Sequence, residues 1–129
     1  MKYEWYECRT EAELGILLRR IGASDSEIEE TVSHEFQHRE EGERLGYAFD
    51  GYSVSSCLNG WYVVNPNLVG FPKVEDTVRI ALAPDRPSPE DRSMALMLIE
   101  MIQRTEPDKA LKLFQEHYLP KLGGEVNEL

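Results

Sequence analysis

Residues 33–38 read Ser-His-Glu-Phe-Gln-His, a stretch that contains the spacing H-E-x-x-H. It lies inside a predicted helix whose first turn carries Ser24 and Glu27, the spacing of a capping box. In that helix His34 and His38 lie one turn apart on one face. The fold of the chain and its chemistry are therefore both organised around this one helix.

The predicted helix runs to about Leu45 and ends at Gly46, and its apolar residues define the face expected to meet the core. A step of 100° per residue places three of them on one stripe: Ile28, Val32 and Phe36. The same step places His34 and His38 about 150° away. We therefore expect the two histidines to face solvent, or to line a cleft closed by another part of the chain.

Two imidazoles at this spacing can bind one metal ion. Neutral histidine nitrogens bind zinc at about 2.0–2.1 Å, and side chains one helical turn apart can both reach it. The ion acidifies a bound water, and a neighbouring carboxylate can take the proton as the water attacks a carbonyl. Glu35, beside His34, is placed to be that base.

The motif resembles the active-site helix of the zincin metallopeptidases, over five of the 129 residues. The resemblance implies that His34 and His38 are zinc ligands and that Glu35 is the catalytic base. The longer pattern H-E-x-x-H-x-x-G-x-x-H is absent, because position 41 is Glu and position 44 is Arg. The resemblance implies a hydrolase of unknown substrate.

A catalytic zinc needs a third protein ligand, and Glu41 is the candidate on the histidine face. It lies about 10 Å along the helix axis from His34, so both side chains would have to stretch. A rival hypothesis treats Glu35-x-x-His38 as half of a di-iron carboxylate site. The chain has no second Glu-x-x-His, so that site would require a homodimer.

The remaining chain predicts an α+β fold in a single small domain, residues 1–129, with four or five helices packed against a β-hairpin. Residues 1–9 are expected to be a short strand or a tail, and residues 123–129 a tail. Two strands, about 47–55 and 61–64, flank an Asn59-Gly60 turn, and Asn65-Pro66-Asn67 is predicted as a loop. Residues 74–83 fit a strand or a helix, and we favour the helix. Further helices are predicted to begin at Ser88 and Pro107.

Composition limits the partners. With 24 acidic and 14 basic residues the formal charge is −10, which disfavours nucleic acid and anionic membrane surfaces. The N-terminus has no apolar signal region, so a cytoplasmic location is expected. Cys8 and Cys57 are too few for a disulfide framework and are expected to be reduced.

An alternative hypothesis needs no metal. The helix from Met94 to Ile102 is apolar around most of its circumference, and the predicted hairpin is rich in aromatic residues. In so small a chain these surfaces exceed what a monomer readily covers. The alternative is a non-catalytic interaction protein that forms a homo-oligomer.

Overall fold

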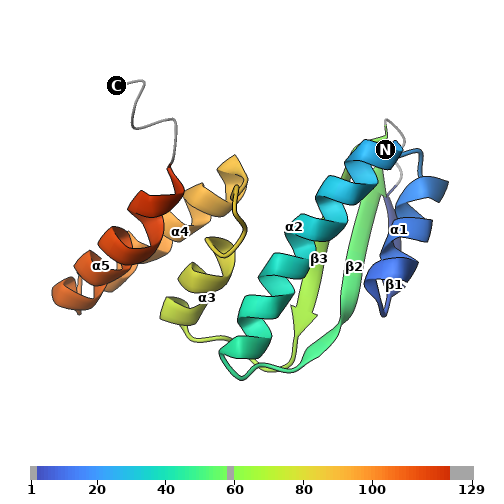
Figure 1. The fold of residues 1–129 in the computed structure, drawn as a ribbon. Coiled ribbons are helices and arrows are strands. Elements are labelled where there is room, and N and C mark those ends of the chain that lie inside the picture. Colours follow the sequence, from blue (N-terminus) through green and yellow to red (C-terminus); the bar gives the residue numbers. More distant parts are fainter. Residues whose placement is uncertain (1–2, 58–59, 123–129) are drawn as a thin grey trace. The chain divides into compact units, whose positions relative to one another are not determined.

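The computed structural model describes residues 3–57 and 60–122, and it confirms the α+β class (Figure 1). Its contacts divide the chain into two compact units, Met1–Gly70 and Phe71–Leu129. The first unit contains the sheet and the motif helix, and the second is helical. The assignment of residues 1–129 to a single domain stays a prediction.

The first unit has the order strand, helix, helix, strand, strand. Its elements are β1 (Tyr3–Cys8), α1 (Glu11–Arg20), α2 (Asp25–Arg44), β2 (Phe49–Cys57) and β3 (Tyr62–Leu68). The strands form one antiparallel sheet in the order β1-β2-β3. The predicted hairpin is therefore present, with a third strand added by residues expected to be a strand or a tail.

Both helices of this unit pack on one face of the sheet. Leu14 and Leu18 of α1 are fully buried against Tyr52 and Val54 of β2. Alternate strand residues point to opposite faces, so the even-numbered residues of β2 in this region face the helices. The core of the first unit is this helix-facing layer.

Strand β3 extends further than the sequence predicts. Asn65, Pro66 and Asn67 were expected to form a loop, but all three lie within β3, where Asn65 and Pro66 pair with Ser53 and Tyr52 of β2. Proline is tolerated here because β3 is the last strand in the sheet order, where a missing N–H breaks no ladder on the outer side. The Asn59 half of the predicted turn lies outside the described residues.

An irregularity in β2 depends on a glycine. The register between β2 and β3 shifts between Phe49 and Tyr52. Gly51, in this segment, has a φ of +81°, and a Cβ there would lie 2.6 Å from the carbonyl oxygen of Cys8. Only glycine allows both this backbone conformation and this approach of β1.

The second unit is a small helical cluster. It contains α3 (Val74–Ala81), α4 (Pro89–Gln103) and α5 (Pro107–Leu113), continued by a π-helical turn (Phe114–Tyr118) and a 3-10 turn (Leu119–Lys121). The helix preferred for residues 74–83 is confirmed. In the described part of the chain, no helix is long and apolar enough to cross a membrane.

A polar network joins α1, α2 and β2 inside the first unit. The Tyr52 hydroxyl, on a fully buried side chain, donates to Glu11 Oε2 at 2.5 Å. Arg39 Nη1 donates to the same oxygen at 2.7 Å. The Arg39 guanidinium also lies 3.8 Å from the centre of the Phe49 ring. One carboxylate therefore links three elements.

The network shifts the pKa values of its acids in opposite directions. Burial acts to raise the pKa of Glu11, but the hydrogen bonds from Tyr52 and Arg39 outweigh it and leave that pKa below its usual value. Burial, followed by the bond to Glu11, raises the pKa of Tyr52. Both shifts favour a charged Glu11 that accepts from a neutral Tyr52.

We expect Glu11→Gln to lower the free energy of unfolding at pH 7 by about 1.5–3 kcal/mol, because a charge-assisted acceptor is lost. A depressed carboxyl pKa adds stability above the unfolded value of about 4.3 and loses it as the pH falls. The variant should therefore lose less stability than the parent between pH 6 and pH 3.

Urea unfolding followed by tryptophan fluorescence measures this, since Trp5 and Trp61 both belong to the first unit. Glu30→Gln, at an exposed position of α2, is the matched control and should follow the parent. Equal acid sensitivity in parent and Glu11→Gln would contradict the assigned role of the network.

Candidate metal centre

The candidate centre lies on α2, a helix with well-defined ends. The Ser24 side chain accepts from the backbone N–H of Glu27, and the Glu27 carboxylate accepts from the backbone N–H of Ser24. The predicted capping box is thus confirmed. At the other end Leu45 caps the helix and Gly46 follows with a φ of +99°.

The face of α2 that meets β3 is polar. Its residues form a polar stripe that runs from Thr31 to Gly42. At one end of this stripe the Thr31 and Tyr62 hydroxyl oxygens are 3.5 Å apart. At the other end Gly42 packs so closely on Leu68 that a Cβ would lie 2.7 Å from a methyl carbon. Glu35 and His38 fall between these two residues along the same stripe.

This orientation differs from the predicted one. Glu35 and His38 are buried, with exposed fractions of 8% and 6%, while Phe36 is 39% exposed. Ile28 and Val32 do pack against the core cluster, as predicted, but only as half-buried residues. The physical reason is that two elements flank α2, so its apolar residues meet α1 while its polar stripe meets β3.

The two histidines lie close enough to share an ion. Their Nε2 atoms are 3.1 Å apart, and their rings meet edge to face with centroids 4.8 Å apart. Two nitrogens bound to one tetrahedral zinc lie about 3.3 Å apart, as bond lengths near 2.05 Å require. The separation also fits a hydrogen bond between one protonated nitrogen and the other. The residues thus fit an ion with little movement.

Glu35 completes a group of three possible ligands. One ligand atom from each of His34, Glu35 and His38 can be chosen so that all lie within 4.8 Å of one another. This group could hold a metal ion, as the H-E-x-x-H spacing predicts. The carboxylate is near enough either to bind the ion or to take a proton from water bound to it.

Glu41, the predicted third ligand, has another partner. Its two carboxylate oxygens accept from Nε and Nη2 of Arg44, each at 2.6 Å. It does not belong to the compact group of His34, Glu35 and His38. Its assignment as a ligand stays a prediction, and the ion pair with Arg44 would have to open first.

Arg39 has a role that the motif did not indicate. It follows His38 directly, and its side chain turns to Glu11 and Glu43. Burial acts to lower its pKa, but the hydrogen bonds to Glu11 and Glu43 outweigh this and raise it. The guanidinium is therefore a fixed charge of the Glu11 network, and the motif could not indicate this because Glu11 lies 28 positions away in the sequence.

No protein-family model, curated protein or solved structure matches the chain. The functional argument therefore depends on the geometry of the group itself.

Proposed function

We propose that this chain is a zinc-binding domain whose ion is held by Nε2 of His34 and His38. The observation that carries the proposal is the 3.1 Å separation of these atoms, close to that of two ligands on one tetrahedral ion. Imidazole suits zinc and neighbouring transition metals, while magnesium and calcium prefer oxygen ligands. The ligand chemistry therefore favours zinc.

In this proposal Glu35 is the third protein ligand. Its carboxylate oxygen lies within the 4.8 Å group, so a change of side-chain rotamer brings it to the ion. A water molecule completes the tetrahedron. Glu35 and His38 are more than nine-tenths buried, which leaves little room for a substrate carbonyl beside the ion. The geometry thus supports an ion that stabilises the packing of α2 on the sheet.

We expect protein prepared without chelators to contain about one equivalent of zinc, and added zinc at 100 times its Kd to stabilise the metal-free protein by about 2.7 kcal/mol. His34→Ala and His38→Ala should each abolish both effects. His117→Ala, which removes the chain's other histidine in the second unit, should change neither.

Elemental analysis and thermal unfolding at graded zinc concentrations measure these effects. Less than about a tenth of an equivalent of zinc, iron or manganese, with no stabilisation by added zinc, would overturn the proposal.

Glu35→Gln tests the role of the carboxylate, because it keeps the shape and removes the charge. If Glu35 is a ligand, zinc affinity falls by about tenfold or more, and the parent protein shows no peptidase activity. Glu30→Gln, at an exposed position of the same helix, is the matched control and should leave zinc affinity unchanged.

The opposite result would favour zincin-like hydrolysis. In that case the parent cleaves peptides, Glu35→Gln keeps its zinc, and activity falls by about 10²-fold or more, the scale for losing a general base. Zinc titration and a peptide-cleavage assay on the same preparations distinguish the two roles.

A second candidate function is self-association through α4. Met94, Met97 and Met101 lie on one face and are 41%, 54% and 49% exposed. Flexible thioether side chains suit adaptable apolar interfaces. This observation favours the alternative that the chain forms a homo-oligomer.

We expect Met97→Lys to shift the chain toward monomer at high micromolar concentration, because a charge enters the apolar face. Gln103→Lys, an exposed position on another face of α4, is the control. Light scattering measures the mass. A parent that is already monomeric at this concentration would rule out the candidate.

A further inference from the structure

Strand β1 lies at the edge of the sheet opposite to the one that α2 contacts. Across the described residues, 3–57 and 60–122, β1 pairs with β2 alone, from Tyr3 to Cys8. Alternate backbone N–H and C=O groups of such a strand point away from the sheet and can pair with another chain. The edge is therefore a template for an added strand.

One hollow lies between β1 and the neighbouring residues of α1. It has a volume of about 490 Å³ and is lined by residues 5–8 of β1, of which Tyr6 and Cys8 pack against the helix-facing core. Ile16 and Leu17 of α1 supply its apolar wall, with Ile16 57% exposed, and Glu13 and Arg20 supply its charged rim. The hollow suits an apolar side chain.

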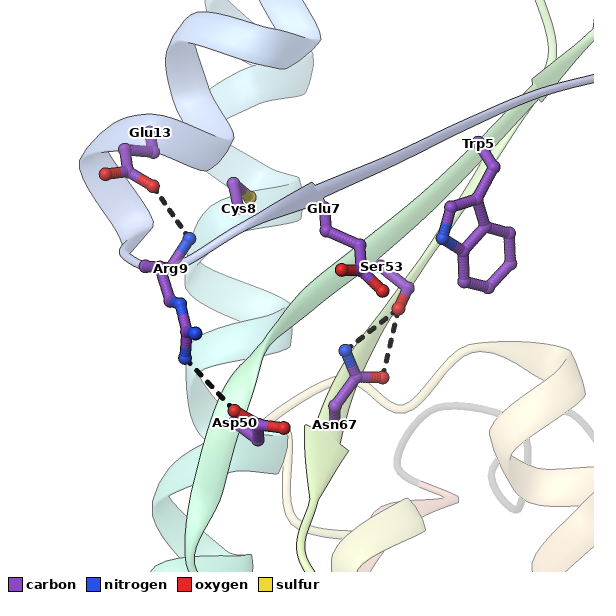
Figure 2. Close-up of a pocket in the computed structure, with 8 residues that line it drawn as sticks. All are labelled: Trp5, Glu7, Cys8, Arg9, Glu13, Asp50, Ser53 and Asn67. Atoms are coloured by element: carbon purple, nitrogen blue, oxygen red, sulfur yellow. Dashed lines mark hydrogen bonds and ion pairs between the residues drawn. The ribbon is translucent and has the colours of Figure 1, made fainter.

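A second hollow, of about 600 Å³, lies along the same strand and reaches Ser53 and Asn67 on the other face of the sheet, with Cys8 and Glu13 on its helix side (Figure 2). Trp5 and Glu7 of β1 line this hollow together with Ser53 and Asn67. The Ser53 and Asn67 side chains are joined by hydrogen bonds of 2.9 and 3.1 Å. Ser53 is 6% exposed, so it forms a rigid floor, while the Trp5 ring is 65% exposed. The hollow offers an aromatic face beside a carboxylate.

The charges along this edge favour a cationic occupant. Glu4 and Glu7 are exposed on β1, and Glu13 of α1 lines both hollows. Arg9, the cation of the second hollow, is already paired with Asp50 at 3.1 Å. A guanidinium or ammonium group can lie on the Trp5 ring and pair with Glu7.

We propose that the edge of β1 binds an extended basic peptide, which adds to the sheet as a fourth strand. Successive side chains of a strand point to opposite faces, so alternate residues of the peptide enter the two hollows. Apolar side chains pack against α1, and Lys or Arg side chains lie on Trp5 and Glu7. The partner is thus a segment with alternating apolar and basic residues.

A second copy of this chain fits the edge poorly. Its β1 would bring Glu4 and Glu7 to an edge that already carries them, and each chain has a formal charge of −10. Like charges on paired strands are destabilising. Charge complementarity therefore selects a basic partner over self-pairing, and this argument does not depend on the metal centre.

The probe is the capped hexapeptide Arg-Val-Arg-Val-Arg-Val, titrated into the full chain and followed by calorimetry and tryptophan fluorescence. We expect saturable binding with one peptide per chain. A peptide of the same composition in the order Arg-Arg-Arg-Val-Val-Val should bind at least about tenfold more weakly, because it loses the alternation. A version of the alternating peptide that is N-methylated at the residues whose N–H groups would pair with β1 should not bind, because it lacks these hydrogen-bond donors.

The protein variants test the same site. Glu7→Lys replaces the attraction between a carboxylate and the basic peptide with a repulsion and should weaken peptide binding by about tenfold. Glu30→Lys makes the same charge change at an exposed position of α2, and its affinity for the peptide should stay within about twofold of the parent's. Trp5→Ala should weaken binding while the far-UV circular dichroism stays unchanged.

Three results would overturn the proposal. The first is that the alternating peptide does not bind. The second is that the reordered and N-methylated peptides bind as well as the parent peptide, which would indicate attraction by net charge alone. The third is that light scattering shows a dimer that Glu7→Lys dissociates, which would assign the edge to a second copy.

Discussion

Three elements of the first unit are joined through one half-buried carboxylate, that of Glu11. Glu11 begins α1, and its Oε2 accepts hydrogen bonds from Tyr52 on β2 and from Arg39 on α2. Because Arg39 is held on this side, the rotation of α2 about its axis is fixed. Residues one turn earlier, Glu35 among them, are then directed toward the sheet. Hydrogen bonds between residues far apart in the sequence thereby hold the motif helix against α1 and β2.

The sequence predicted the elements better than it predicted which side of each element is buried. Capping residues are local signals, and Ser24 with Glu27 located the start of α2 correctly. The buried side of α2 depends on two neighbours, α1 and β3, that are distant in sequence. A single apolar stripe, Ile28 to Phe36, could indicate only one of them, so the burial of Glu35 and the exposure of Phe36 were not predicted, while the burial of His38 fits the alternative of a covered cleft. The third strand was difficult for a similar reason, since β1 gains its partner only when β2 arrives more than 40 residues later.

At the candidate site too, local spacing was predictable from the sequence and the pairing of the charged side chains was not. His34 and His38 come together because helical spacing places them one turn apart, and that part could be read from five residues, while a ligand atom of the adjacent Glu35 lies within 4.8 Å of theirs. Glu41 shares the same helix, yet its carboxylate is held by Arg44, three residues away. The motif also did not show that Arg39 would turn away from the site toward Glu11. Charges that crowd a motif in the sequence can thus be withdrawn from it in space by pairing with one another.

The polar stripe of α2 has an energetic consequence. Placing a carboxylate and an imidazole against a sheet is less favourable than placing leucine there, even when each has a hydrogen-bond partner. Gly42 adds to this by bringing α2 close to Leu68 without contributing a side chain of its own. A helix selected only for packing would fill these positions with apolar residues. An ion bound by His34, Glu35 and His38 would convert the same residues into a source of stability, because binding energy realised only in the folded state adds to folding. The presence of buried polar residues, Glu35 and His38, on the face of α2 that meets β3 is therefore the physical reason to look for a metal here.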